Sequence, residues 1–183
     1  MMRHVAFLRG INVGTAKRIA MADLRRVFEA AGYTGVRTHL QSGNVVFDSP
    51  TPLEAAATTR LEDAIADGTG VRSRVLVLSA EKFLAIAEAN PLADAPDPSR
   101  MVVTFLDAAP DESAVVRPSD DDLAPERIVF GRDAIYQWCP DGILGARVIP
   151  GSLKTAATVT TSRNLRTVNK LVEMIRAPDG PVA

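Results

Sequence analysis

The residues best suited to chemistry lie in one segment near the N-terminus, Leu8-Arg9-Gly10-Ile11-Asn12-Val13-Gly14. It follows an apolar run typical of a strand and precedes a segment with the apolar spacing of a helix. Glycines in such a loop let the backbone turn and leave amide N–H groups free to meet an anion. With Arg9, Lys17 and Arg18 nearby, the loop predicts a site for a phosphate or a carboxylate.

The same loop also has a purely structural interpretation. In it, the glycines allow a long strand-to-helix connection, and Ile11 and Val13 fill the core. Two known phosphate motifs are absent, since the Gly-Lys-Ser/Thr ending of a P-loop and the third glycine of a dinucleotide fingerprint are both missing. The loop therefore names no ligand, and no cofactor is expected.

A second polar cluster, Thr161-Ser162-Arg163-Asn164, is expected to open the last helix, from about residue 163 to residue 175. Thr161 or Ser162 can cap this helix, and the free N–H groups of its first turn favour negative charge. We therefore expect Arg9, Asn12 and the 161–164 segment to converge within reach of one bound anion. In the structural alternative, Arg163 and Asn164 only tie the helix to neighbouring backbone.

Other chemically competent side chains are few. Neither His4 nor His39 has a cysteine or carboxylate at metal-ligand spacing, so no metal site is expected. Cys139 at a strand end is expected to be a small buried hydrophobe rather than a nucleophile. The three aspartates from Asp120 to Asp122 are expected in a solvated loop, 118–125. The sequence assigns no catalytic residue, and whether the protein is an enzyme stays open.

Bulk composition is that of an ordinary globular protein. The 183 residues are 46% hydrophobic and 23% charged, with a formal net charge of -1. Such a charge gives no global basic field, so any contact with nucleic acid must be a local patch. One cysteine excludes an internal disulfide, and no signal peptide or membrane span is recognised, so a cytoplasmic location is expected.

Apolar spacing predicts alternating elements. In the first half, strands are expected at 3–9, 36–41, 45–48 and 71–78, and helices at 21–31, 52–66 and 80–90. In the second half, strands are expected at 101–106, 127–130 and 134–139, with a short helix at 111–116 and one or two helices after the last strand. Residues 42–44, Ser-Gly-Asn, predict a tight hairpin turn because Gly and Asn tolerate positive φ.

The βαββαβ order of the first half predicts a ferredoxin-like split βαβ unit, and the second half partly repeats it. The expected fold is therefore α+β, with two ferredoxin-like halves, antiparallel sheets and a C-terminal helix. The proline-rich segment 91–100 predicts a division into halves 1–90 and 91–183.

One face of the first sheet is expected to be polar and partly basic. Arg37, His39 and Gln41 alternate along one strand, and Arg72 and Arg74 along another. Such a face binds a polyanion, or is solvated, or is covered by the second half. None of these residues is aromatic, which disfavours RNA recognition by base stacking.

The chain resembles a bacterial family known only as domain of unknown function sixteen-ninety-seven. The resemblance rests on the sequences LRGINVG at 8–14, LQSGNVVF at 40–47, PDGI at 140–143 and TSRNLRTVNKL at 161–171. It implies a two-part α+β fold built from ferredoxin-like elements, and it implies no reaction. The chain departs from the family at Thr15, at Leu165 and at Gly145-Ala146-Arg147, where glycine, tryptophan and a Ser-Lys pair are usual.

Loop, turn and C-terminal motif together supply the candidate ligand-binding residues. These are Arg9, Gly10, Asn12, Gly14, Lys17, Gln41, Ser42, Asn44, Ser162, Arg163, Asn164, Thr167 and Lys170.

Three functional interpretations remain open. The first is a binding module for an anionic ligand, either a nucleotide or a nucleic-acid phosphate. The second is an enzyme acting on a small polar or phosphorylated metabolite, and the third is that the motifs are purely structural. A concave pocket favours a small molecule, whereas an open basic stripe favours nucleic acid. The sequence assigns no oligomeric state.

Overall fold

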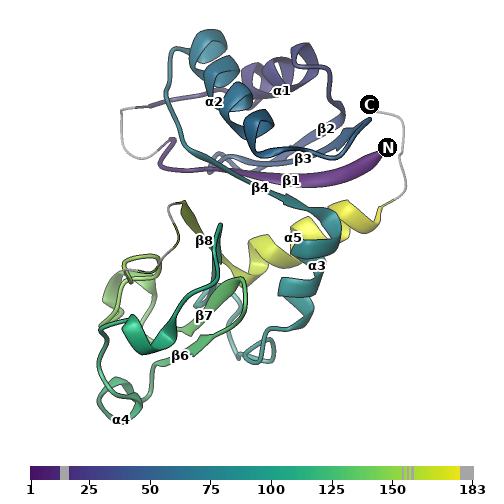
Figure 1. Cartoon of the computed structure of the whole chain (residues 1–183). Coiled ribbons are helices and arrows are strands. Elements are labelled where there is room, and N and C mark those ends of the chain that lie inside the picture. Colours follow the sequence, from purple (N-terminus) through teal and green to yellow (C-terminus); the bar gives the residue numbers. More distant parts are fainter. Residues whose placement is uncertain (13–16, 154, 156, 158, 178–183) are drawn as a thin grey trace. The chain divides into compact units, whose positions relative to one another are not determined.

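A computed structural model of the chain describes residues 1–12, 17–153, 155, 157 and 159–177. The chain forms two compact units, coloured along the sequence in Figure 1. Unit 1 comprises Met1–Leu84 and the chain from Leu171 onward, and unit 2 comprises Ala85–Lys170. These units differ from the expected halves in that they divide within helix α3 (Ala80–Glu88), and the last part of helix α5 (Leu165–Arg176) belongs to unit 1.

Unit 1 contains one antiparallel sheet with the strand order β2-β3-β1-β4. Its strands are β1 (Met2–Leu8), β2 (Thr34–His39), β3 (Asn44–Ser49) and β4 (Val75–Ser79). Helices α1 (Met21–Ala30) and α2 (Ala55–Thr69) lie together on one face of the sheet (Figure 1). This is the βαββαβ arrangement that the sequence predicts.

The core of unit 1 lies between the sheet and these two helices. Alternate residues of β1, Ala6 and Leu8, face it, as period-two patterning requires. Helical spacing brings an apolar stripe of each helix against them. The fully or nearly buried helix residues are Leu24, Val27 and Phe28 on α1 and Leu61 and Ile65 on α2.

The opposite face of this sheet differs from the expected open polar face. The register places Arg37 in one row with Val46 and Val5, and both valines are fully buried. Phe7 on this face lies with its ring centroid 6.1 Å from that of Phe83 of α3. The Arg37 guanidinium donates to the Met174 carbonyl of α5 at 2.7 Å. The expectation of an open face failed because the strands carry apolar residues between the arginines.

Arg72 and Arg74 also differ from their expected positions. Strand β4 begins at Val75, so both arginines belong to the segment that leads into the strand rather than to a sheet face.

The β2–β3 turn is longer than the expected Ser-Gly-Asn turn. Leu40 (φ 58°) and Gly43 (φ 75°) take left-handed conformations, and residues 40–43 form the turn. Asn44 is instead the first residue of β3 and is fully buried, where its Nδ2 donates to the His39 carbonyl at 2.8 Å and to Ser42 Oγ at 3.0 Å. The Asn44 side chain thus closes the turn from inside.

Unit 2 contains a second antiparallel sheet with the order β6-β7-β5-β8. Its strands are β5 (Met101–Leu106), β6 (Arg127–Phe130), β7 (Ala134–Trp138) and β8 (Thr160–Asn164). The α+β fold with two antiparallel sheets is confirmed, and both sheets have the same order when strands are counted within each unit. The connection from β7 to β8 carries a 3₁₀-helix, Ile143–Gly145, where unit 1 has α2.

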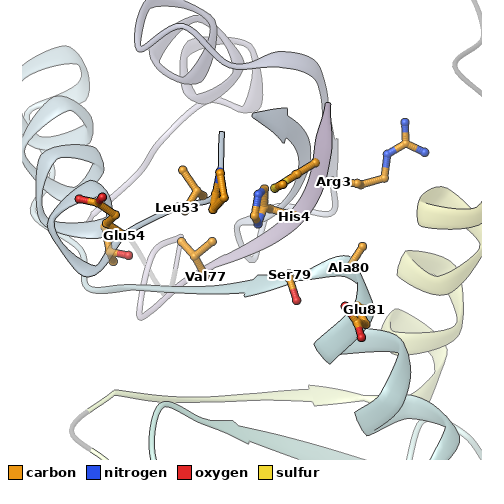
Figure 2. Close-up of a pocket in the computed structure, with 11 residues that line it drawn as sticks. Arg3, His4, Leu53, Glu54, Val77, Ser79, Ala80 and Glu81 are labelled. Carbon is orange, nitrogen blue, oxygen red and sulfur yellow. The ribbon is translucent and has the colours of Figure 1, made fainter. Parts of the chain in front are cut away.

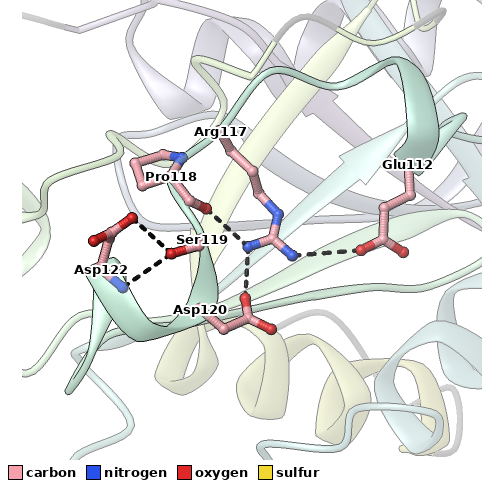
Figure 3. A network of polar contacts seen from close by, with 6 residues as sticks. All are labelled: Glu112, Arg117, Pro118, Ser119, Asp120 and Asp122. Carbon is pink, nitrogen blue, oxygen red and sulfur yellow. Dashed lines mark hydrogen bonds and ion pairs between the residues drawn. The ribbon is translucent and has the colours of Figure 1, made fainter.

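The acidic run is helical rather than a loop. It forms helix α4 (Asp120–Leu123), which Ser119 caps by accepting from the Asp122 N–H, while Leu123 is fully buried. The short helix expected at 111–116 is a 3₁₀-helix, Glu112–Ala114. Figure 3 shows the contact that joins the two: the Arg117 guanidinium pairs with Asp120 at 2.6 Å and with Glu112 at 3.4 Å.

Among the residues that the structure describes, no helix combines the length and the apolar character that crossing a membrane requires.

Replacing Gly43 with Ala tests the turn. A Cβ there meets Leu8 Cβ and the Ile11 side chain at 2.8 Å, on a backbone whose φ is +75°. We expect a loss of about 2–4 kcal/mol of unfolding free energy, because strain at positive φ adds to overpacking. The matched control is Gly70→Ala, with a φ of +73° and nothing within 4 Å of the added Cβ, which should lose only about 1 kcal/mol. Equal losses in urea denaturation would contradict the contact with Leu8 and Ile11.

Candidate functional site

The loop after β1 closes on itself through left-handed backbone. Gly10, Asn12 and Lys17 have φ values of 67°, 54° and 53°. The Asn12 N–H donates to the Lys17 carbonyl at 2.9 Å, which brings the two described ends of the loop together. Gly14, one of the predicted ligand residues, lies outside the described residues.

The Asn12 side chain holds this loop in place. Its Nδ2 donates to the carbonyls of Ile19 at 3.0 Å and Gln41 at 2.7 Å, and its Oδ1 accepts from the Ile19 N–H at 2.9 Å. Both amide protons are therefore engaged with backbone. Asn12 joins the loop to the β2–β3 turn, so the structure gives it a positioning role in addition to the predicted ligand role.

Ser73 ties the same loop to the segment before β4. Its Oγ donates to the Arg9 carbonyl at 2.9 Å and accepts from the Arg9 N–H, and that N–H also donates to the Arg74 carbonyl at 2.9 Å. Backbone contacts thus place the arginines of residues 72–74 beside Arg9.

These contacts enclose a cavity of about 570 Å³, named the loop cavity here. Its lining consists of Arg9, Gly10, Lys17, Glu62, Asp63, Arg72, Ser73 and Arg74. Three predicted site residues, Arg9, Gly10 and Lys17, are therefore brought together in unit 1.

The charges of the loop cavity are mostly positive. Four of its side chains are cationic and two are acidic, and all four cations are exposed to solvent. Glu62 is already engaged, since its carboxylate pairs with Arg74 at 3.2 Å and accepts from the Val75 N–H at 2.8 Å. Within the described residues, neither Arg9 nor Arg72 forms an ion pair. The cavity therefore has cationic groups available for an anion.

Gln41, Ser42 and Asn44 lie in the β2–β3 turn and do not line the loop cavity. Gln41 and Ser42 have exposed side chains, and Gln41 reaches the loop only through the hydrogen bond from Asn12 to its carbonyl. These three residues keep their predicted ligand role as a prediction only.

The C-terminal motif has a different local structure from the one expected. Thr161, Ser162 and Arg163 belong to strand β8, and the helix begins at Leu165. Neither Thr161 nor Ser162 caps it, because Asn164 Oδ1 accepts from the N–H and the hydroxyl of Thr167, each at 3.0 Å. The sequence concealed the strand because it ends where the helix starts, with no turn residue between.

The side chains of β8 are engaged with their own unit. The Ser162 hydroxyl lies 2.8 Å from that of Thr104. Arg163 donates to Thr161 Oγ1 at 2.8 Å, and burial lowers the pKa of its guanidinium to about 10. Lys170 is exposed on α5. These residues belong to unit 2 and Arg9 and Asn12 to unit 1, and the predicted convergence of the two groups stays a prediction.

Sequence reasoning missed Arg72 and Arg74 as partners of Arg9. The signal was present in their charge, but an alternating pattern was interpreted as a strand face, and Ser73 gave no reason to place them beside a loop 64 residues away in the chain.

The remaining candidates of the sequence have ordinary environments. Cys139 is fully buried, and this burial raises the pKa of its thiol to about 11, which fits the expected small hydrophobe. Within the described residues, no three His, Cys, Asp or Glu side chains gather as metal ligands.

Comparison with known proteins identifies a family and a fold. A family model described as "Protein of unknown function (DUF1697)" matches residues 1–136. A solved structure of the conserved bacterial protein SP0830 from Streptococcus pneumoniae matches with a TM-score of 0.68 at 23% identity, covering 96% of this chain and 99% of that one. At this identity, the likeness supports the fold alone. No curated protein matches the chain.

Replacing Asn12 with Ala tests its positioning role. The variant loses three hydrogen bonds to backbone and a residue type that tolerates positive φ, so we expect the unfolding free energy to fall by about 2 kcal/mol. The control is Asn169→Ala on the exposed surface of α5, which should change it by less than about 0.5 kcal/mol. If the two variants melt alike, Asn12 does not hold the loop.

Proposed function

Since the chain belongs to the DUF1697 family, whose description assigns no activity, we propose a function from the site itself: the protein binds a small phosphate-bearing ligand in the loop cavity. The observation that carries this proposal is the gathering of Arg9, Lys17, Arg72 and Arg74 around one hollow of about 570 Å³.

The shape of the site supports a small ligand. A hollow of a few hundred Å³ is the size that small-molecule sites have, whereas a nucleic-acid backbone needs a continuous basic stripe. The net charge of -1 also leaves the rest of the surface without an excess of cations for a polyanion.

Charge supports a phosphate over a neutral ligand. Arginine offers a planar fork of donors that matches phosphate oxygens, and a lysine adds a point charge. Asp63 opposes an anion, and Glu62 does so less because Arg74 partly neutralises it. Two or more cations remain in excess, so a dianionic group is the favoured occupant.

Pyrophosphate is the probe for this proposal. Binding to the native protein should raise the melting temperature by mass action, and calorimetric titration gives the affinity. We expect Arg9→Ala and Arg72→Ala each to weaken binding about fivefold, as the loss of one partly exposed ionic contact does. Added salt should weaken binding further, because it screens exposed charges.

The matched control is Arg60→Ala, which removes an exposed arginine of α2 that does not line the cavity. It should leave the affinity for pyrophosphate unchanged. Equal weakening by Arg60→Ala and Arg9→Ala would show only general attraction to the surface. Tighter binding of a single-stranded oligonucleotide than of pyrophosphate, at equal phosphate concentration, would favour nucleic acid.

A further inference from the structure

A second cavity of unit 1 contains a buried histidine whose hydrogen-bonding capacity is unused. This cavity, named the histidine cavity here, measures about 600 Å³ and lies among the start of β1, the end of β4 and the first residues of α2 and α3 (Figure 2). The residues used below are Arg3, His4, Leu53, Glu54, Val77 and Glu81, all of which line it.

His4 is the polar centre of this cavity. Its side chain belongs to a residue only 5% exposed, and its ring stacks on Phe47 with centroids 5.5 Å apart. The Nε2 atom is buried and has no hydrogen-bond partner among the described residues. Buried polar atoms are rarely left so, and each one calls for an explanation such as an absent ligand. Figure 2 shows the imidazole on the same side of β1 as Leu53 and Val77.

The imidazole is neutral, and a neutral imidazole has one nitrogen that accepts. Burial lowers the pKa of His4, and this effect outweighs the nearby Asp48 carboxylate, which raises it. A cationic His4 would be costly here, so the ring meets a ligand as an uncharged hydrogen-bonding group.

The cation on the lining is not available to a ligand. Arg3 donates from Nε and Nη2 to the two carboxylate oxygens of Asp48, and from Nη1 to the carbonyls of Ile175 and Ala177 at 2.8 and 3.0 Å. Figure 2 shows its guanidinium directed away from His4.

The acidic side chains of the lining are available. Glu54 and Glu81 are exposed, and neither forms an ion pair within the described part of the chain. Each lies at the start of a helix, where the dipole supplies about half a positive charge, less than the full negative charge of a carboxylate. The mouth of the cavity is therefore negative overall.

From these observations we propose that the histidine cavity binds a small primary ammonium compound with an apolar body. Its ammonium group donates to Nε2 of His4 and is attracted by Glu54 and Glu81, and its alkyl portion lies against Leu53 and Val77. The site is separate from the loop cavity and opposite in charge, so neither proposal depends on the other.

Butylammonium is the probe, with 1-butanol and butyrate as controls of the same carbon number. The readout is the side-chain ¹⁵N resonance of His4, and His39, the other histidine of the chain, is the control within the same spectrum. We expect saturable shifts at His4 alone, at a butylammonium concentration about tenfold below that needed for either control. As the pH falls and His4 becomes protonated, this binding should disappear.

The double variant Glu54→Gln/Glu81→Gln tests the charge without disturbing the core. It should weaken butylammonium binding about fivefold and leave 1-butanol binding unchanged. The proposal is overturned if His4 does not respond to butylammonium, if butyrate or 1-butanol is as effective, or if the double variant binds butylammonium as the original protein does.

Discussion

The side chain of Asn12 sets the constraint on which the loop site depends. A loop rich in glycine has many conformations, and fixing it costs conformational entropy. Three hydrogen bonds from one amide, to Ile19 and to Gln41, tie the loop at both its own end and the neighbouring turn. The left-handed backbone of Asn12 makes this geometry reachable, since asparagine tolerates such φ values better than most residues.

Backbone contacts, rather than acidic partners, hold the cations of the loop cavity together. Ser73 fixes the main chain of Arg9, and Glu62 pairs only with Arg74. Repulsion among Arg9, Lys17 and Arg72 therefore persists in the free protein and is relieved when an anion enters. Such a preformed arrangement lowers the ordering cost of binding. The histidine cavity of the same unit carries the opposite charge, so the two sites discriminate between ligands by sign.

Much of the fold could be predicted from the sequence, because each core element carries a regular pattern. Leu24, Val27 and Phe28 have helical spacing, and the chain from Met101 to Leu106 is an apolar run of strand length. Strand β8 could not be recognised, because Thr160 to Asn164 is polar and its strand character comes from pairing with β5. Tertiary pairing of this kind overrides local propensity.

The candidate site could be predicted only in part, for the same reason. Arg9 and Lys17 adjoin the glycine loop in the sequence, so their role was visible there. Arg72 is brought to them by hydrogen bonds between Ser73 and Arg9, which no local pattern records. The unpaired Nε2 of His4 was equally invisible, because it depends on what surrounds the ring.

The most direct test of the loop site is to map pyrophosphate onto the folded protein by backbone amide chemical shifts. The account predicts that the saturable shifts centre on Arg9, Gly10, Lys17 and residues 72–74, and that the exposed β6–β7 hairpin around Arg132 does not respond. Shifts spread over many exposed cations, or centred away from the loop cavity, would contradict it.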